Sequence, residues 1–186
     1  TSCNYSQVTE PEDSLGWTVG DGAAAFIVSA ADGDSGYLGS HAIHTGNTCD
    51  TMSLEVVSPP STQPPVLRMR ASAQSGRGRK ETAEPFLRAC VDGAVKYAGF
   101  AVNDIDFFVF NTPTAWYADF CARVLGIARE RTNDADPRFA NVGPVLMPAN
   151  LHEALSAGRI RPGQLVLLYG VGSVSSMQGF QGSRVL

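Results

Sequence analysis

The spacing of apolar residues in the last quarter of the chain predicts a helix followed by a buried strand. In residues 147–157 large apolar side chains recur at helical intervals, at Met147, Leu151 and Leu155. Pro148 falls in the first turn, where a helix tolerates proline, and Gly158 marks the end. Residues 165–169 then form an uninterrupted apolar run, which is typical of a strand covered on both faces. This order of elements predicts an α/β fold.

Upstream patterns predict a long helix and a hairpin. Residues 82–98 carry an apolar face at helical spacing, and Gly99 follows as a stop. Residues 23–29 and 37–44 have the composition of strands, and the segment between them is rich in Gly and Asp. We therefore expect these two strands to pair as a hairpin.

Two other stretches are too polar or too rich in proline to suggest a packed element. Residues 49–65 carry Ser, Thr and two Pro-Pro pairs, which predicts an exposed loop. Residues 129–138 are mostly charged or polar, and we expect a solvent-exposed connection there.

Composition argues against several classes of protein. The chain has 186 residues, of which 44% are hydrophobic and 17% charged, as in one globular domain. Its net charge of −4 and pI of about 5.3 argue against nucleic-acid binding. No apolar run reaches the roughly 20 residues of a membrane helix, and the N-terminus lacks a secretory pattern. We expect a cytoplasmic protein that binds neither nucleic acid nor a membrane.

The four cysteines do not suggest a metal site. They form no CxxC pair, and no histidine lies at a metal-ligand spacing from them. Cys90 and Cys121 fall within expected helices, where a free thiol behaves as a small core residue. The sequence therefore predicts no metal.

Three blocks of sequence occur in an order that resembles a known family. Residues 141–179 contain an Asn loop, a helix, a Pro-Gly turn, an apolar strand and a Gly-rich turn. Residues 19–28 read VGDGAAAFIV, and residues 104–111 read DIDFFVFN. Together they resemble the C-terminal half of the ketoacyl-ACP synthase III branch of the thiolase superfamily. The resemblance implies an α/β thiolase-like fold, with a mixed sheet covered by helices.

The resemblance also divides the chain. Residues 1–48 correspond to the end of the N-terminal thiolase-like half and contain the expected hairpin. Residues 49–80 correspond to an exposed Pro- and Ser-rich loop, and residues 81–186 to the C-terminal half. The nucleophilic cysteine of the family belongs to the N-terminal half outside the matched segment, so Cys3 is assigned no catalysis.

Two asparagines are the catalytic candidates that the resemblance implies. In the family a cysteine thiolate takes an acyl group from a thioester, and a His and an Asn donate hydrogen bonds to the thioester oxygen. Asn141 matches the family Asn, although it can also be a loop residue or helix cap. Asn111 stands where the family places its His. Because an amide cannot take up a proton near neutral pH, decarboxylative condensation by the usual route is in doubt.

Further residues are expected to bind substrate by the same resemblance. Gly170, Gly172 and Ser173 form the Gly-rich turn, where backbone can approach a ligand closely. Thr114 lies just after Asn111. Trp116 occupies a position where the family commonly carries a basic residue for docking the carrier protein.

The resemblance implies partners but no cofactor, because acyl-CoA or an acyl carrier protein serves as the substrate. We expect a tightly bound N-terminal half, as a fragment or subunit that carries the nucleophilic Cys, and a homodimer of the assembled enzyme. Thr1 is a candidate processing terminus. Self-cleavage, an ordinary protease and an engineered boundary are alternative origins for it.

Three functional hypotheses remain. The first is an acyltransferase of polyketide or other secondary metabolism, which uses a Cys on the other half and avoids decarboxylation by transferring to an amine or alcohol. The second is a non-catalytic structural subunit, a degenerate homologue within a heteromeric condensing enzyme. The third, a ketoacyl synthase III of fatty-acid initiation, is disfavoured by Asn111 and Trp116.

Overall fold

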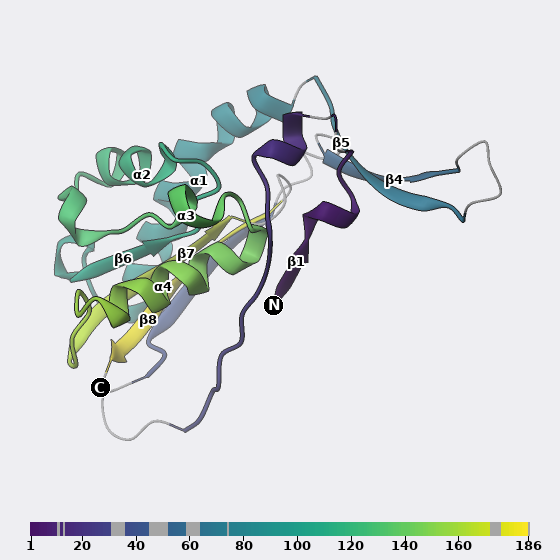
Figure 1. Ribbon diagram of the computed structural model, residues 1–186. Coiled ribbons are helices and arrows are strands. Elements are labelled where there is room, and N and C mark those ends of the chain that lie inside the picture. Colours follow the sequence, from purple (N-terminus) through teal and green to yellow (C-terminus); the bar gives the residue numbers. More distant parts are fainter. Residues whose placement is uncertain are drawn as a thin grey trace.

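The computed structural model describes residues 1–10, 12, 14–30, 36–44, 52–58, 64–73, 75–171 and 176–185 (Figure 1). Its strands are β1 (Ser2–Asn4), β2 (Asp21–Ala23), β3 (Gly39–His44), β4 (Met52–Val57), β5 (Val66–Ala71), β6 (Phe107–Phe110), β7 (Gln164–Val171) and β8 (Ser176–Val185). Its α-helices are α1 (Ser75–Ala98), α2 (Tyr117–Leu125), α3 (Asp136–Phe139) and α4 (Leu146–Ser156). Short 3-10 turns are η1 (Tyr5–Gln7), η2 (Ser14–Trp17), η3 (Val102–Asp104), η4 (Arg129–Arg131) and η5 (Gly143–Val145).

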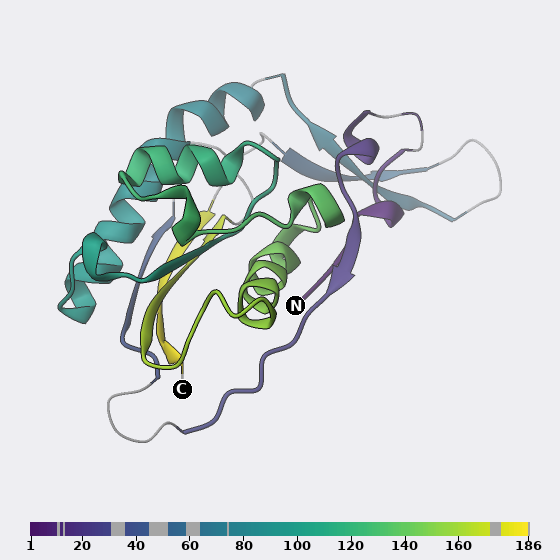
Figure 2. The ribbon, with the colours of Figure 1, turned by 60° about the vertical axis from the view of Figure 1, so that its left-hand side comes forward.

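A four-stranded mixed sheet forms the centre of the structure, in the order β3-β8-β7-β6. β6 and β7 run parallel, whereas β8 runs antiparallel to both of its neighbours. Figure 2 shows α1 and α2 on one side of this sheet and α4 on the other. This arrangement confirms the predicted α/β class and the mixed sheet covered by helices.

The two faces of β6 explain why the whole strand is apolar. Phe108 and Phe110 pack with residues of α1 and α2 in one core cluster, which also contains Leu167 and Tyr169 of β7. Phe107 and Val109 point to the other face and pack in a second cluster with Ala154 of α4. Since successive strand residues alternate between faces, a strand with helices on both sides must be apolar throughout.

The predicted helices and the strands of the C-terminal part are confirmed. α4 covers the helix expected over residues 147–157, and Gly158 follows it at φ 66°. β7 contains the predicted strand 165–169. α1 contains the helix expected over residues 82–98 but begins earlier, at Ser75, with Pro85 inside it.

The predicted hairpin of residues 23–29 and 37–44 is wrong. β2 ends at Ala23 and pairs with β1, and residues 24–30 continue without regular structure. β3 forms as a strand, but it pairs with β8, from Gly39 opposite Gln181 to His44 opposite Ser176. The local turn signal was therefore overridden by pairing with a strand far away in the sequence.

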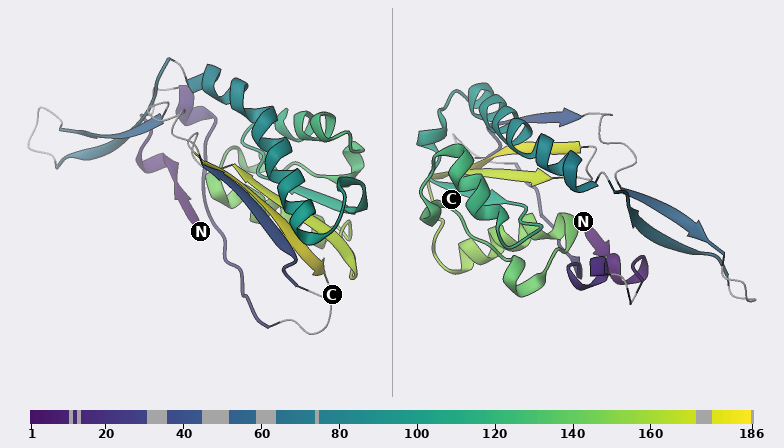
Figure 3. Two further views of the ribbon diagram at one scale, coloured as in Figure 1. Left: turned by 180° about the vertical axis from the view of Figure 1, so that it is seen from behind. Right: turned by 90° about the horizontal axis from the view of Figure 1, so that it is seen from above.

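The segment expected to be an exposed loop, residues 49–80, contains regular structure instead. β4 and β5 pair along their whole length, from Met52 opposite Ala71 to Val57 opposite Val66. They form an arm that projects from the body, as both panels of Figure 3 show. α1 then begins inside the same segment. The prediction of a loop is therefore wrong, although most residues of β4 are exposed as expected. Alternation of apolar and polar residues in residues 66–71 was the missed strand signal.

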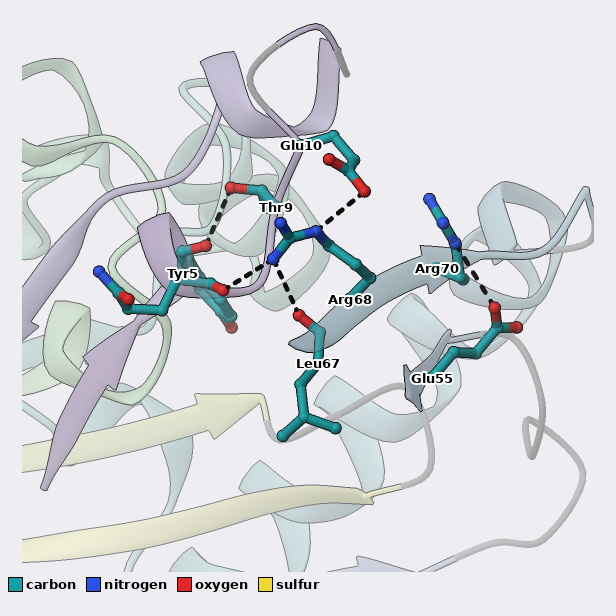
Figure 4. Close-up of polar contacts among 8 residues, drawn as sticks. Tyr5, Thr9, Glu10, Glu55, Leu67, Arg68 and Arg70 are labelled. Carbon is teal, nitrogen blue, oxygen red and sulfur yellow. Dashed lines mark hydrogen bonds and ion pairs between the residues drawn. The ribbon is translucent and has the colours of Figure 1, made fainter. Parts of the chain in front are cut away.

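Contacts with the N-terminal segment hold the base of this arm (Figure 4). Arg68 of β5 pairs with Glu10 at 2.9 Å and donates to the Gln7 carbonyl at 3.2 Å. The backbone N–H of Met69 donates to the Val8 carbonyl at 2.7 Å. The arm is thus attached to the segment of residues 5–10, and Met69 is the one buried position that the structure describes in β5.

Candidate functional site

Asn111 lies at the carboxyl end of β6, where it extends the pairing with β7. Its backbone N–H donates to the Tyr169 carbonyl at 2.8 Å, and its side-chain Nδ2 donates to the Val171 carbonyl at 3.1 Å. The second bond fixes the orientation of the amide, because only the nitrogen end can donate to a carbonyl. The side chain is buried, with 4% of its surface exposed, and its Oδ1 has no hydrogen-bond partner among the described residues.

This environment places an unused acceptor at the end of two parallel strands. Crevices outside the carboxyl ends of parallel strands are common ligand sites in α/β proteins. Gly170 lies between the two β7 carbonyls that bind Asn111, so the structure brings these two predicted site residues together. Gly172 and Ser173 lie outside the described residues.

A buried polar network, which the sequence analysis missed, supports the loop after β6. Asn150 of α4 donates from Nδ2 to the Phe110 carbonyl at 2.9 Å and to the Thr112 hydroxyl at 3.0 Å. Asn133 in turn donates to the Asn150 carbonyl at 2.8 Å. Asn150 therefore connects α4 to the residues on either side of Asn111 and restricts where that side chain can lie.

The position of Asn150 corrects the predicted core face of α4. Leu146, Asn150 and Ala154 form the fully buried row of this helix. The predicted stripe at Met147, Leu151 and Leu155 is only partly buried or exposed. Because Asn150 is polar, hydropathy alone could not place it in a core. The available signal was its spacing, because an uncharged residue four positions after Leu146 and four before Ala154 lies on the same helix face as both.

The segment expected to be a solvent-exposed connection also contributes to this network, so that prediction is wrong in part. Thr132 and Asn133 are buried, and Thr132 bridges to Phe108 at the free edge of β6. Arg159 donates to the Thr132 carbonyl at 2.9 Å. The charged residues around them remain mostly exposed, which is why the stretch looks polar in the sequence.

Asn141 lies in a tight loop before η5. Its Oδ1 accepts a hydrogen bond from the Gly143 N–H at 2.9 Å, and its backbone N–H donates to the Thr18 carbonyl at 3.1 Å. With the oxygen used locally, the Nδ2 group makes no hydrogen bond to any described residue. Asn141 is thus both the loop-forming residue that was weighed as an alternative and a side chain with donors to spare.

The backbone before Asn141 is strained. Ala140 has φ 54° and ψ −164°, a combination that glycine adopts and other residues rarely do. Such strain costs about 1–3 kcal/mol and tends to occur at functional sites. The strain therefore supports a functional role for this loop independently of any resemblance.

The N-terminal segment packs closely against the Asn141 loop. Val19 bridges to Asn141, and a Cβ added to Gly20 would lie 2.9 Å from the Phe139 carbonyl oxygen. Only glycine fits at that position. A Cβ on Gly143 would lie 3.0 Å from the Tyr5 hydroxyl and 3.1 Å from the Cys3 sulfur.

Cys3 has the environment of a core residue. It is buried, its Sγ lies 3.8 Å from the Gly20 carbonyl oxygen, and burial raises the pKa of the thiol. A raised pKa reduces the thiolate fraction on which nucleophilic attack depends. Its chemistry therefore agrees with the expectation that Cys3 is not the nucleophile.

The remaining predicted residues lie apart from one another. Thr114 is in the loop before α2, and its Oγ1 is buried without a hydrogen-bond partner among the described residues. Trp116 lies just before α2, is 59% exposed, and contacts Tyr117 and Phe120 through its ring. Thr1 exchanges hydrogen bonds with Ala24. The structure records no hydrogen bond between Asn111 and Asn141 among its described residues, and their joint role stays a prediction.

Beneath the end of β6 lies a core with weakly acidic side chains. Burial raises the pKa of Tyr117, Tyr169 and Cys121, so all three stay neutral at physiological pH. Cys121 and Cys90 are fully buried in this core, as the sequence predicted. None of these groups is suited to take a proton from a substrate near neutral pH.

Two grooves flank α4. The larger, of about 930 Å³, lies between α4 and the segment 129–139, and it includes no predicted site residue. The smaller, of about 440 Å³, lies between α4 and residues 23–26. Within the described residues no group of three or more His, Cys, Asp or Glu side chains is arranged to hold a metal ion. None of the described helices combines the length and apolarity needed to span a bilayer.

Comparison with known proteins agrees with this geometry. Residues 95–180 match the family model described as 3-oxoacyl-[acyl-carrier-protein (ACP)] synthase III C terminal. A beta-ketoacyl-[acyl-carrier-protein] synthase III from Erythrobacter litoralis is 32% identical over 174 residues, covering 90% of this chain and 52% of that protein. The enzyme of the same name from Brucella canis is 31% identical over 158 residues, covering 82% of this chain and 47% of that protein.

A solved structure shares the fold. The 3-oxoacyl-(acyl carrier protein) synthase III of Pseudomonas aeruginosa superposes with a TM-score of 0.76 at 19% identity, covering 98% of this chain and 56% of that one. The chain thus spans about half the length of the relatives it matches. It is homologous to the C-terminal half of beta-ketoacyl-ACP synthase III, an enzyme of the thiolase superfamily, and shares the fold of that half.

Proposed function

We propose that this chain forms the C-terminal half of a ketoacyl-ACP synthase III-like acyltransferase. In the assembled protein, meaning this chain together with the half of the fold that its relatives carry in addition, a cysteine on that other half accepts an acyl group from a CoA or carrier-protein thioester. The acyl group then passes to an amine or alcohol. Homology to condensing enzymes supports the class, and the environment of Asn111 supports the departure from condensation.

The observation that carries this proposal is the orientation of the Asn111 amide. Its Nδ2 is held by the Val171 carbonyl, which leaves one N–H and the buried Oδ1 for a ligand. The N–H can donate to a thioester oxygen, and Oδ1 can accept a hydrogen bond from the O–H or N–H of an acceptor. A neutral imidazole also carries one donor and one acceptor, but it can take up a proton near neutral pH, whereas this amide cannot.

The chemistry balances without a base at position 111. In the first step the cysteine S–H and the acyl thioester give an acyl-cysteine and the free thiol of CoA or carrier. In the second step the acceptor oxygen or nitrogen attacks the acyl carbon, the C–S bond breaks, and the acceptor proton ends on the cysteine sulfur. Neither step removes CO₂, so the missing imidazole is not required.

Asn141 contributes the second donor in this proposal. Its oxygen is used by Gly143 and its nitrogen is not, so the side chain presents N–H groups only. A fixed donor of this kind stabilises the oxyanion that forms when the acyl carbon becomes tetrahedral. The strained Ala140 immediately before it is consistent with a loop shaped for function.

A second candidate function is a non-catalytic subunit that stabilises an active homologue. The specific observation in its favour is again Asn111, whose amide is tied to β7 and can serve a purely structural purpose. The two candidates differ in one outcome, because only the first predicts an acylated cysteine and its turnover.

Intact mass spectrometry of the assembled protein with a series of acyl-CoA compounds tests the proposal. We expect an acyl mass on one cysteine of the other half, and its loss when an amine or alcohol acceptor is added. If the cysteine is acylated, the acyl group is not released to any acceptor and CO₂ is released from a malonyl thioester, the protein catalyses ordinary decarboxylative condensation and the proposal is wrong. Absence of any acyl adduct across the series would favour the non-catalytic subunit.

Two variants at one position sharpen the test. Asn111→Ala should slow transfer by about 100-fold, as expected for the loss of a donor to the oxyanion. Asn111→His should slow transfer to the acceptor and introduce release of CO₂ from malonyl thioesters, because an imidazole restores the family arrangement. A secondary-metabolic role, a homodimer and a cytoplasmic location accompany this proposal, and they are tested by product identification, sedimentation and cell fractionation.

A further inference from the structure

The larger groove, of about 930 Å³ between α4 and the segment 129–139, carries an excess of positive charge. Its ionisable lining residues are Arg129, Arg138, Arg159, Asp134, Glu153 and His152. The chain as a whole has a net charge of −4, so a groove with more arginines than carboxylates departs from the rest of the molecule. A groove of this size has room for an organic ligand, and its charge favours an anionic one.

Arg159 is the cation best placed to bind such a ligand. Its Nη2 donates to the Glu130 carbonyl at 2.8 Å and to the Thr132 carbonyl at 2.9 Å. Its guanidinium carbon also lies 5.1 Å from the centre of the Phe107 ring. These contacts fix the guanidinium but use only some of its N–H groups. The side chain is exposed, and among the described residues no carboxylate is paired with it.

The other two arginines of the groove can assist Arg159. Arg129 pairs with Asp119, and Arg138 pairs with Glu153. The two arginine side chains nevertheless stay 41% and 68% exposed, so each keeps N–H groups that can reach a ligand. Guanidinium groups bind phosphate and carboxylate through parallel N–H donors, which makes this groove suited to an oxyanion.

A buried acceptor in the same groove favours a ligand that also carries hydrogen-bond donors. Asn133 lines the groove and is 8% exposed, and its Nδ2 donates to the Asn150 carbonyl at 2.8 Å. That bond fixes the amide, whose Oδ1 has no hydrogen-bond partner among the described residues. Because a buried acceptor is costly to leave unpaired, we expect a ligand or a water molecule held by it to satisfy this oxygen.

We propose that this groove is a binding site for an organic oxyanion, a phosphate or a carboxylate, that also carries hydroxyl groups. The oxyanion accepts hydrogen bonds from Arg159 and from Arg129 or Arg138. A hydroxyl group donates to Oδ1 of Asn133, directly or through one water molecule. A simple inorganic anion leaves the acceptor unsatisfied, and a neutral sugar leaves the arginine unpaired, so the ligand combines both kinds of group.

Asn133 also connects this groove to the loop that carries Asn111. It donates to Asn150, whose side chain holds the Phe110 carbonyl and the Thr112 hydroxyl on either side of Asn111. A ligand that fixes Asn133 therefore restrains the loop after β6. This inference goes beyond the proposed function and does not rest on it, because binding and restraint are independent of acyl transfer.

Isothermal titration calorimetry of the assembled protein tests the ligand class with four probes: ribose monophosphate, ribonate, ribose and inorganic phosphate. We expect saturable binding of ribose monophosphate or ribonate, at least about tenfold tighter than binding of ribose or inorganic phosphate, because each of the latter makes only part of the contacts. The tighter of the first two identifies the oxyanion. Inorganic phosphate that binds as tightly as both would overturn the proposal. So would the absence of saturable binding by all four, as expected if the other half of the fold fills the groove.

A charge-neutralising variant locates the binding. Arg159→Gln should weaken binding of the tighter probe by at least about tenfold, because the oxyanion loses a charged donor. The matched control is Arg88→Gln, which removes the same charge from an exposed position on α1, on the other side of the sheet. It should leave the affinity unchanged. Equal affinities of the Arg159→Gln and wild-type proteins would place the ligand elsewhere and overturn the proposal.

A matched pair at Ser156 tests the groove without touching the arginines. Ser156 is exposed and lines the groove, so neither Ser156→Glu nor Ser156→Gln should disturb folding. The two side chains are similar in size, but only glutamate repels an oxyanion. We expect Ser156→Glu to bind the tighter probe at least about tenfold more weakly than Ser156→Gln. Equal affinities of the two variants would contradict recognition of an anion in this groove.

Amide hydrogen exchange tests the connection to the loop. The Asn111 N–H, which donates to the Tyr169 carbonyl, should exchange more slowly when the tighter probe is bound. Unchanged exchange at saturation would overturn the restraint. An assembled protein that binds the probe but is never acylated would remove the proposed function and leave this site intact, whereas acylation without probe binding would do the reverse.

Discussion

β6 and residues 24–30 are both mainly apolar, but β6 forms a buried strand and residues 24–30 do not form a strand. β6 is paired with β7, covered by α1 and α2 on one face and by α4 on the other, and buried at every position. Residues 24–30 make no strand, and their largest side chains are exposed. The difference shows that an apolar run becomes a strand only where other segments supply both hydrogen bonds and cover.

Removing a side chain from the covered run has the largest expected effect. Phe108→Ala should lower the free energy of unfolding by about 3–5 kcal/mol, because a fully buried ring leaves a cavity among residues that cannot close it. Denaturant titration of the assembled protein measures the change. Leu54→Ala, on the exposed side of the arm, is the control and should change it by less than about 0.5 kcal/mol.

The second-largest effect is expected at Asn150, whose side chain supports the end of β6. Asn150→Ala should cost about 2–3 kcal/mol, because the Phe110 carbonyl and the Thr112 hydroxyl lose a buried donor. Under the proposed function it should also reduce acyl transfer, because the loop after β6 loses this support. Ser156→Ala on the exposed side of the same helix should do neither, and a similar loss for both variants would mean that α4 itself, not the network, is what matters.

Alkaline pH should weaken the core beneath β6. Burial raises the folded-state pKa of Tyr117, Tyr169 and Cys121 above ordinary values of about 8.5–10. The unfolded chain therefore loses these protons first, so stability is complete below that range and falls as pH rises through it. The slope should reach at most about 1.4 kcal/mol per pH unit for each group. Tyr169→Phe should flatten the decline; an unchanged slope would contradict the assignment.

Relief of backbone strain should have a smaller effect of opposite sign. Ala140→Gly should raise the unfolding free energy by about 1 kcal/mol, because glycine adopts the observed φ of 54° without steric cost. If the strain serves the site, acyl transfer should fall while stability rises. Ala157→Gly at the end of α4, where φ is −83°, is the control and should not stabilise.

The smallest effect is expected at the arm formed by β4 and β5. Arg68→Met removes the pair with Glu10 and should cost less than about 1 kcal/mol, because the pair is partly exposed. Amide exchange in β5 should rise while exchange in β6 stays unchanged. A comparable rise in β6 would mean that the arm and the central sheet unfold together.

Sequence patterns were sufficient wherever an element is covered within this chain. The helices over residues 82–98 and 147–157 and the strand over residues 165–169 formed as predicted. Patterns failed at the hairpin of residues 23–29 and 37–44, because β3 pairs with β8, which is far away in the sequence. They also failed at residues 49–80, where β4 and β5 pair with each other although the prolines and polar residues predicted a loop. The candidate residues Asn111 and Asn141 came from resemblance, whereas Asn150 and Asn133 were missed because hydropathy scores a buried amide as polar.

The amino-acid sequence by itself determined the α/β class and the helices and strands over residues 82–98, 147–157 and 165–169, because periodicity is a local property. Only the tertiary structure decided that β3 pairs with β8, that Asn150 lies in the core, and that Leu151 and Leu155 line a groove. These outcomes depend on which distant surfaces meet, and a polar or apolar side chain carries no information about its partner until the chain has folded.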